Sequence, residues 1–339
     1  MSRQVSLANA AITVIAMSVL LPGSAPAQDG LSQCLSEAVQ GADGSVTVGE
    51  LRADCARKTA DDVGEVKPDT GPVYEVSALD ERQAALEKVE GRPFVLTPHK
   101  PSYLLVTQMA QPNHAPYVAS TGVNEPLNDT ELKFQFSVKA PVWRDMFGSE
   151  LDLYMAFSTT AWWQVANDEL SAPFRETNYE PELFLRSVAD HDFLGMTIAG
   201  WQLGINHESN GRTEPLSRGW NRIMGRLNLE IGRDLAIQLR AWHRIPQSAD
   251  VDGNPRIYRY LGYGDIRAVW APNKNTLTAM VRPTTEKTSF ELTWSYPVSR
   301  VFRVYAQYYN GYGESLIDYD FDIERWGIGF AFNDYLMSQ

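Results

Sequence analysis

The sequence predicts an all-β fold, an antiparallel twelve-stranded transmembrane β-barrel with a short helical N-terminal periplasmic extension. Three observations predict this fold class. The chain opens with an export signal, apolar and polar residues alternate from about residue 100 onward, and no stretch beyond the signal reaches 18 consecutive apolar residues. Because a bilayer offers the backbone no hydrogen-bond partners, only helices and closed barrels span it, so an exported membrane protein without an apolar helix is expected to be a barrel.

The export signal occupies residues 1–27. Arg3 precedes an apolar run from Ala8 to Leu21, and the small-residue motif Ala25-Pro26-Ala27 follows. This order of a basic residue, an apolar core and small residues is typical of a secretory signal peptide, with cleavage after Ala27. The apolar run is too short to remain as a spanning helix.

Residues 28–95 are expected to form the periplasmic extension and a linker to the barrel. Thr47 and Glu50 have the spacing of a capping box, which indicates the start of a short helix. An even pair of cysteines in an exported protein predicts a disulfide, here between Cys34 and Cys55, although two free thiols remain an alternative. In the chain-entropy model such a bridge contributes roughly 3 kcal/mol.

The barrel is expected to span residues 96–339, because this part of the chain alternates apolar and polar residues with the period of a strand. About twelve stretches show the pattern, and their length of roughly ten residues suits a tilted strand that crosses a bilayer. The stretches are 103–109, 132–142, 151–157, 179–188, 201–209, 221–231, 235–241, 265–270, 277–282, 289–296, 302–308 and 326–332.

The second face of most of these stretches is charged, with both signs. In a barrel of this size such side chains are expected to fill the interior as paired Arg, Glu, Asp and Gln, so that no wide channel remains. Tight turns at 232–234 and 297–299 contrast with long loops at 208–220, 244–256 and 310–323, as is usual for the two ends of outer-membrane barrels. Aromatic residues near strand ends are predicted to form interfacial girdles: Trp162, Trp163, Trp220, Trp242, Trp270 and Tyr335.

The bulk composition agrees with this fold and narrows the partners. Alternation keeps the average polar in a barrel, and the mean hydropathy is −0.30 with 11% aromatic residues. The net charge of −12 argues against a nucleic-acid partner. A soluble β-sandwich is an alternative, and there the apolar face would form a core instead of meeting lipid.

Three polar residues interrupt the apolar face of two consecutive predicted strands. His207 and Ser209 share the parity of apolar Leu203 and Ile205, and Asn221 begins the apolar face of the next strand. Two residues along a strand cover about 6.6 Å, so the hydroxyl of the serine can reach the imidazole. Polar groups that face lipid are costly and usually functional, which makes these residues candidates for a site.

The three residue types suit acyl transfer. Ser209 can act as nucleophile, His207 as base and Asn221 as the group that orients the imidazole. A neutral amide in the third role avoids the desolvation cost of a carboxylate on a lipid-facing surface. Because an amide stabilises the imidazolium less, the oxyanion needs further support, which the backbone N–H of Gly211 and a metal ion can supply.

Five motifs carry a resemblance over roughly residues 95–335: Trp162-Trp163-Gln164, Phe174 to Pro181, Asn206 to Arg212, Ser217 to Arg222, and Gly311 to Tyr319. By these motifs the chain resembles the bacterial outer-membrane phospholipase A family. The resemblance implies a calcium-dependent phospholipase A1/A2 and lysophospholipase that is active as a homodimer. It would hydrolyse phospholipids in the outer leaflet of the outer membrane, with the site on the extracellular side.

The resemblance also implies roles for individual residues. Ser209, His207 and Asn221 would form the catalytic triad, and the backbone N–H groups of Ser209 and Gly211 would bind the oxyanion. Ca²⁺ would be held by the backbone oxygen of Arg212 and by Ser217 of one subunit, together with Ser171 of the other.

Two positions depart from the family pattern. Glu214 stands where the family can carry an Asp linked to a second calcium site, and Thr159 stands where a Gln at the dimer seam is expected. A non-enzymatic barrel, either a narrow pore or a structural protein, is the second hypothesis for function, and it predicts that replacing Ser209 has no effect.

Overall fold

The computed structural model of the chain describes residues 84–86, 88–89, 95–122, 124, 126–168, 174–248 and 252–336. The chain divides into two units, 1–73 and 74–339, and all described residues belong to the second unit. The predicted signal peptide at 1–27 and the predicted Cys34–Cys55 disulfide lie outside the described residues, as does Ser171.

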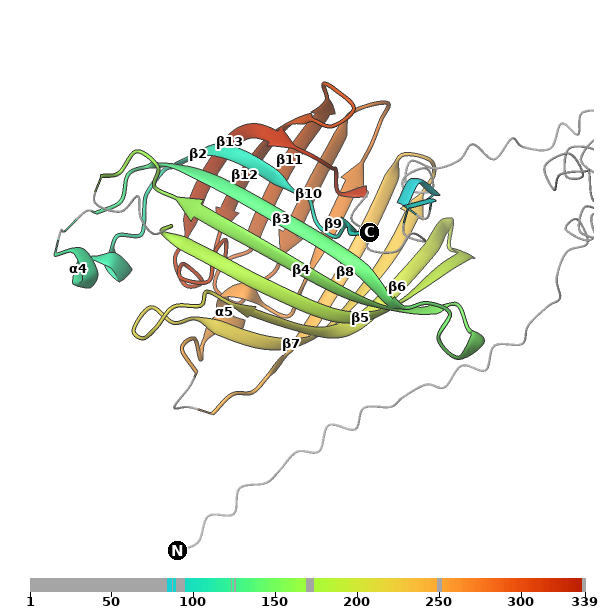
Figure 1. Cartoon of the computed structure of the whole chain (residues 1–339), viewed down its shortest axis with the longest axis horizontal. Helices are drawn as coiled ribbons and strands as arrows, with labels where there is room; N and C mark the ends of the chain where they lie inside the picture. Colours follow the sequence, from blue (N-terminus) through green and yellow to red (C-terminus); the bar gives the residue numbers. More distant parts are fainter. Residues whose placement is uncertain are drawn as a thin grey trace, which may run out of the picture. The chain divides into compact units, whose positions relative to one another are not determined.

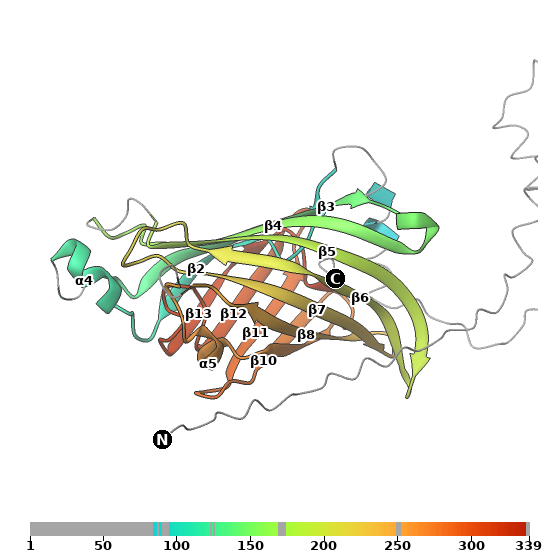
Figure 2. The ribbon, with the colours of Figure 1, turned by 90° about the horizontal axis from the view of Figure 1, so that it is seen from below.

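Twelve antiparallel strands form a closed barrel, as the sequence predicted (Figures 1 and 2). Each strand pairs with the next along the chain, and the pairing of β13 with β2 closes the ring. The strands are β2 Tyr103–Met109, β3 Thr130–Trp143, β4 Leu151–Trp163, β5 Glu176–Phe193, β6 Met196–Ser209, β7 Gly219–Ile231, β8 Leu235–Ile245, β9 Gly264–Trp270, β10 Thr276–Arg282, β11 Ser289–Pro297, β12 Arg303–Gly311 and β13 Ile323–Ala331.

The two ends of the barrel differ as expected. One end carries the long connections, which include helix α4, Ala115–Thr121, between β2 and β3, and helix α5, Ile257–Leu261, between β8 and β9. The other end carries short turns, and the 3-10 turn η1, Met146–Gly148, between β3 and β4 lies there, opposite α4 (Figure 1). The connection between β6 and β7 is on the end with the long loops.

Apolar side chains cover the outside of the barrel because strand residues alternate between its two faces. On β6, Trp201, Leu203 and Ile205 are exposed, whereas Gln202 and Asn206 are buried inside. Such an apolar outer surface suits lipid contact. None of the described helices is long and apolar enough to span a membrane.

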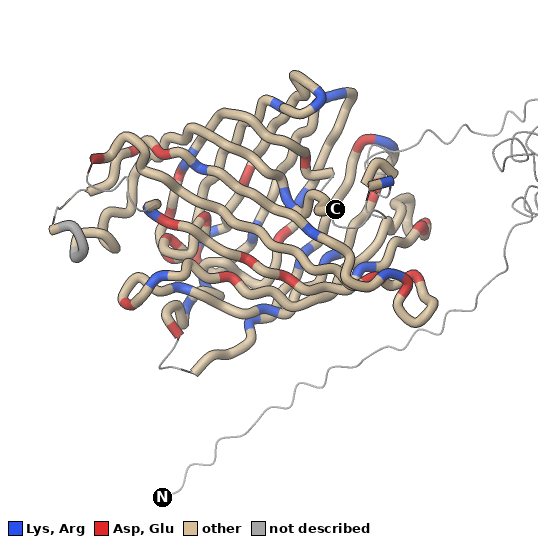
Figure 3. Tube along the Cα trace, viewed as in Figure 1, with Lys and Arg blue, Asp and Glu red and all other residues tan. Residues whose placement is uncertain are grey.

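Charged side chains fill the interior and pair across it, and residues of both signs lie along the strands (Figure 3). Arg325 of β13 lies 2.9 Å from Glu131 of β3 and 2.7 Å from Glu314 of the β12–β13 loop. Arg175 pairs with the same Glu131 and lies 3.0 Å from Asp318. These side chains are almost wholly buried, so removal of one would leave an uncompensated charge. The predicted packed interior is confirmed.

A short segment before β2 enters the barrel, which the sequence did not predict. The two-residue strand β1, Thr97–Pro98, pairs with β3 in line with β2. Between β1 and β2, the four residues 99–102 lie opposite only two residues of β3, 136–137. The extra length turns His99 and Lys100 toward β5, where they pair with Glu182 and Glu180, respectively.

The predicted aromatic girdle is wrong for three of its tryptophans. Trp162, Trp220 and Trp242 are buried, at most 6% exposed, and point into the barrel. Tyr335 also turns inward, and its hydroxyl donates to Glu291 at 3.1 Å. Trp270 is 50% exposed on the outer face, as a girdle residue should be. Side chains alternate between the two faces of a strand, and these three tryptophans occupy positions whose side chains point inward.

Candidate active site on the outer face of strands β6 and β7

The register between β6 and β7 brings the three candidate residues together. His207 is directly opposite Asn221, and Ser209, two residues further along β6, is opposite Gly219. Side chains that are directly opposite or two residues apart on one face are neighbours. All three therefore project from the outer face of the barrel at the end with the long loops, and each is at least partly exposed.

The three side chains form one hydrogen-bonded line. His207 Nδ1 lies 2.8 Å from Asn221 Oδ1, and His207 Nε2 lies 3.0 Å from Ser209 Oγ. Since the amide oxygen only accepts, Nδ1 carries the proton and donates it, which leaves Nε2 of the neutral ring to accept from the serine hydroxyl. A hydroxyl, a base and an orienting group in this order can perform nucleophilic attack on an acyl carbon.

An apolar groove of about 480 Å³ runs along the outer face next to this line. His207 and Asn221 form its polar end, and the apolar side chains of Met155, Leu183 and Ile205 line the rest. The groove is large enough for part of an apolar chain, and its opening is on the lipid-facing surface. An ester that enters it would present its carbonyl to the polar end.

The loop after Ser209 is organised by the side chain of Asn210, a residue that the sequence analysis did not single out. Its Oδ1 accepts from the backbone N–H groups of Arg212, at 3.3 Å, and Arg218, at 2.9 Å. Its Nδ2 donates to the carbonyl of Leu216 at 2.8 Å. The side chain is buried, and the loop of residues 210–218 closes around it. In the sequence, the position of Asn210 between Ser209 and Gly211 was the signal that could have identified it as a residue of the site.

The side chain of Arg212 connects this loop to the start of β5. Its Nη2 donates to the carbonyl of Phe174 at 2.8 Å, and its Nε lies 3.4 Å from the carboxylate of Glu176. The same carboxylate lies 3.4 Å from Nδ2 of Asn210. The loop that carries Gly211 is thus held from two sides. Ser171 precedes this part of the chain but lies outside the described residues.

Inside the barrel, Arg222 supports the strands that carry the site. It is opposite Asn206 in the register and donates from Nε to Asn206 Oδ1 at 2.8 Å. Its Nη2 also lies 2.9 Å from Glu208 and 3.2 Å from Glu180, and its guanidinium stacks on the ring of Trp220 at 4.0 Å. Since Asn206 and Glu208 flank His207, these bonds fix β6 against β7 directly behind the imidazole.

Comparisons with known proteins connect this geometry to a family. A family model described as Phospholipase A1 matches residues 79–332. Phospholipase A1 of Escherichia coli (strain K12) is 40% identical over 244 residues, which cover 71% of this chain and 83% of that protein. The putative phospholipase A1 of Neisseria meningitidis serogroup B (strain ATCC BAA-335 / MC58) is 35% identical over 248 residues, which cover 70% of this chain and 65% of that protein.

Solved structures give the same result. Outer membrane phospholipase A from Escherichia coli superposes with a TM-score of 0.67 at 39% identity, over 72% of this chain and 94% of that chain. The outer membrane phospholipase dimer of Salmonella typhi, with bound calcium, superposes with a TM-score of 0.69 at 37% identity, over 74% of this chain and 97% of that chain. A second Escherichia coli structure is that of an active-site mutant in which an asparagine is replaced by alanine.

Proposed function

This chain belongs to the phospholipase A1 family, whose model matches residues 79–332, and on that basis we propose that it is a calcium-dependent phospholipase A1/A2 and lysophospholipase. Its substrates would be phospholipids of the outer leaflet of the outer membrane. The observation that carries the proposal is the hydrogen-bonded line of Ser209, His207 and Asn221 on the lipid-facing surface.

In this proposal each residue of the line has one role. His207 Nε2 takes the proton of Ser209 as the hydroxyl oxygen attacks the ester carbonyl, and later delivers it to the leaving alcohol. Asn221 keeps the ring in the tautomer that leaves Nε2 free. The backbone N–H groups of Ser209 and Gly211 would receive the oxyanion. The active-site asparagine of the Escherichia coli relative supports the role of Asn221.

The groove beside the line supports a lipid as substrate. Its apolar walls would take an acyl chain that is already embedded in the membrane, so the ester reaches Ser209 without leaving the leaflet. Transfer of an acyl chain from water into the groove would contribute about 0.8 kcal/mol for each CH₂ group. A chain that enters from the surrounding lipid leaves an environment that is already apolar, so it does not gain this free energy. Positioning of the carbonyl, more than affinity, is therefore the main effect of the groove.

The residues at the site fit calcium only as part of a larger ligand set. The described residues contain no group of three or more His, Cys, Asp or Glu side chains that could hold a metal. The carbonyl of Arg212 and the hydroxyl of Ser217 are oxygen donors of the kind that Ca²⁺ prefers, but Ca²⁺ takes six to eight of them. When bound, the ion would supply positive charge beside the developing oxyanion.

A second subunit would supply the missing ligand. Ser171, which falls between β4 and β5 in the sequence, is the candidate, and waters would complete the set. The calcium-loaded dimer of the Salmonella typhi relative supports this arrangement. A ligand set shared between two chains would make the homodimer the active form.

The test is fatty-acid release from mixed phospholipid–detergent micelles by the full chain, with calcium and with chelator. Ser209→Ala should lower the rate by more than about 10³-fold, because the nucleophile is removed. Ser187→Ala, on the neighbouring strand β5 but at the other end of the barrel, is the matched control and should be unaffected. Absence of release from a folded, calcium-loaded dimer of the unaltered protein would overturn the proposal in favour of a non-enzymatic barrel.

A further inference from the structure

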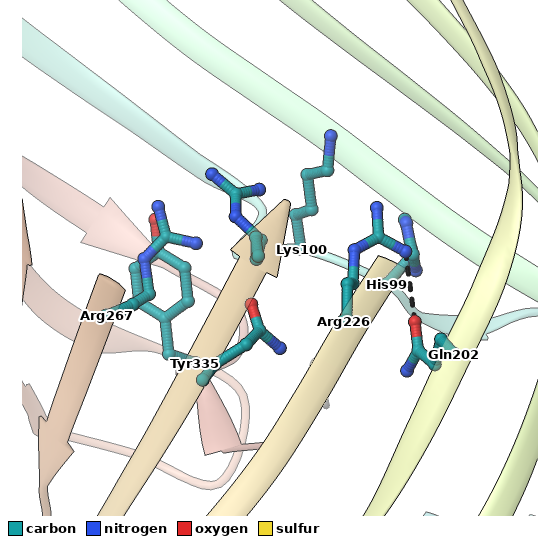
Figure 4. Close-up of a pocket in the computed structure, with 8 residues that line it drawn as sticks. His99, Lys100, Gln202, Arg226, Arg267 and Tyr335 are labelled. Carbon is teal, nitrogen blue, oxygen red and sulfur yellow. Dashed lines mark hydrogen bonds between the residues drawn. The ribbon is translucent and has the colours of Figure 1, made fainter. Parts of the chain in front are cut away.

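A small cavity of about 20 Å³ lies inside the barrel, and its lining contains no residue of the candidate active site. Figure 4 shows the side chains that line it. Four cationic side chains line it, together with polar side chains, and no carboxylate does so among the described residues. The lining residues are His99, Lys100, Gln202, Arg226, Gln238, Arg240, Arg267 and Tyr335. Its volume admits a water molecule or a single small ion, since about 10–15 Å³ suffices for one water.

The register of the sheet forces like charges together at this cavity. Arg226 of β7 is directly opposite Arg240 of β8. Arg267 of β9 is opposite Gln238, so it is the diagonal neighbour of Arg240. Like charges directly opposite each other on one face of a sheet destabilise the pair. Three arginines on three successive strands therefore need negative charge close to their guanidinium groups.

The carboxylates of the chain provide that charge only in part. Arg226 pairs with Glu182, and Arg240 with Asp265, but neither carboxylate lines the cavity. The ion pairs of these arginines fall into three separate groups. One group is balanced, with three cations, Lys100, Arg222 and Arg226, and three carboxylates, Glu180, Glu182 and Glu208. Arg240 shares the single carboxylate of Asp265 with Arg282, so one positive charge has no counterpart there, and Arg267 pairs with Glu291.

Arg267 is the cation with the weakest compensation. Its single ion pair in the described residues, with Glu291, is long, at 4.0 Å. Its Nε has no hydrogen-bond partner among the described residues, although the residue is only 8% exposed. One face of the guanidinium is covered by Tyr335 at 4.5 Å from the ring centroid. A buried donor without an acceptor is costly, so this group points to a ligand that accepts.

We propose that the cavity binds one small inorganic anion of the size of chloride, held by Arg267, Arg240 and Arg226. The anion would supply the missing negative charge and accept from the free Nε of Arg267. It would enter from the end of the barrel with the short turns, where Tyr335 and its neighbour Leu336 pack against Ala199, Ala236 and Val269. The anion site does not depend on the proposed phospholipase function, because it lies inside the barrel and the Ser209–His207–Asn221 line lies on the outer face.

The test is thermal unfolding of the detergent-solubilised full chain at constant ionic strength, with sodium gluconate replaced stepwise by sodium chloride. We expect a saturable rise in the melting temperature of about 2–4 °C for the unaltered protein. Arg267→Gln should abolish this rise. Arg259→Gln removes an exposed arginine of α5, which pairs with Glu286, and should keep it.

Two further measurements keep the proposal falsifiable. Line broadening of chloride-35 in nuclear magnetic resonance reports binding by the unaltered protein directly, so it does not depend on the folding of a variant. Sulfate at the same ionic strength should stabilise much less than chloride, because it exceeds the size of the cavity. Equal stabilisation by gluconate, sulfate and chloride, or no excess broadening of the chloride signal, would overturn the proposal.

Discussion

Replacement of Asn210 by alanine tests whether the loop after Ser209 is held in its productive form by one buried amide. Two backbone N–H groups, of Arg212 and Arg218, lose their acceptor, and the carbonyl of Leu216 loses its donor. Each lost bond costs about 1 kcal/mol when water can partly replace it. The productive loop should therefore lose about 2–3 kcal/mol, which corresponds to a decrease in kcat of about 30- to 150-fold.

The assay is fatty-acid release from mixed micelles at saturating calcium, with kcat and KM separated, together with the calcium concentration for half-maximal activity. We expect kcat to fall and the calcium concentration for half-maximal activity to rise, because the same loop carries Arg212, whose carbonyl is a proposed calcium ligand. Asn228→Ala is the matched control, since this buried asparagine bonds Gln238 near the opposite end of β7. A folded Asn210→Ala protein with kcat within about threefold of the unaltered value would refute the reasoning.

Three further perturbations have defined outcomes. Gly204→Ala places a Cβ 2.3 Å from the carbonyl oxygen of Leu183, so it should destabilise the barrel by about 1–3 kcal/mol in heat-dependent gel mobility, whereas Gly225→Ala, which meets nothing within 4 Å, should not. Burial opposes ionisation of Glu314, but Arg325 and Lys133 outweigh it and lower its pKa from 4.5 to about 2. Its carboxylate therefore stabilises the fold fully above pH 4.5, by about 3 kcal/mol, and this contribution is lost as the pH falls through 2. Glu314→Gln should flatten the acid-unfolding curve in that window, and an unchanged curve would contradict the ion-pair argument. Asn221→Ala should lower kcat while the barrel keeps its melting temperature, because the lost bond lies on the surface; a lower melting temperature with unchanged kcat would assign Asn221 to the fold alone.

Alternation along the strands was sufficient to predict the barrel and the outward direction of the candidate site. Leu203, Ile205 and His207 follow one parity in the sequence, and all three are exposed in the structure. The same parity places Trp220 inside, so the girdle prediction for that residue was wrong because it used position near a strand end and ignored the face. The number of strands, twelve, followed from the number of alternating stretches in the sequence. In a closed barrel each of these strands pairs on both sides.

Other features depend on contacts between distant parts of the chain, which no local pattern contains. The entry of His99 and Lys100 into the barrel is stabilised by Glu182 and Glu180, which are 83 and 80 residues away in the sequence, respectively. Asn210 looks like an ordinary loop residue until the loop closes around it. The cavity beside Arg267 exists because the register places three arginines on neighbouring strands, and register is set by pairing rather than by the sequence of one strand.

The position of the Ser209–His207–Asn221 line on the outer wall has a consequence for the kinetics of the proposed reaction. Phospholipids would reach the line by lateral diffusion within the leaflet, so the encounter is two-dimensional and its rate follows the mole fraction of substrate in the surface. Dilution of phospholipid with inert detergent at constant total phospholipid should then slow turnover. Water is the reactant that has to be delivered, from the side of the long loops, and the filled interior can keep the membrane sealed while the enzyme works.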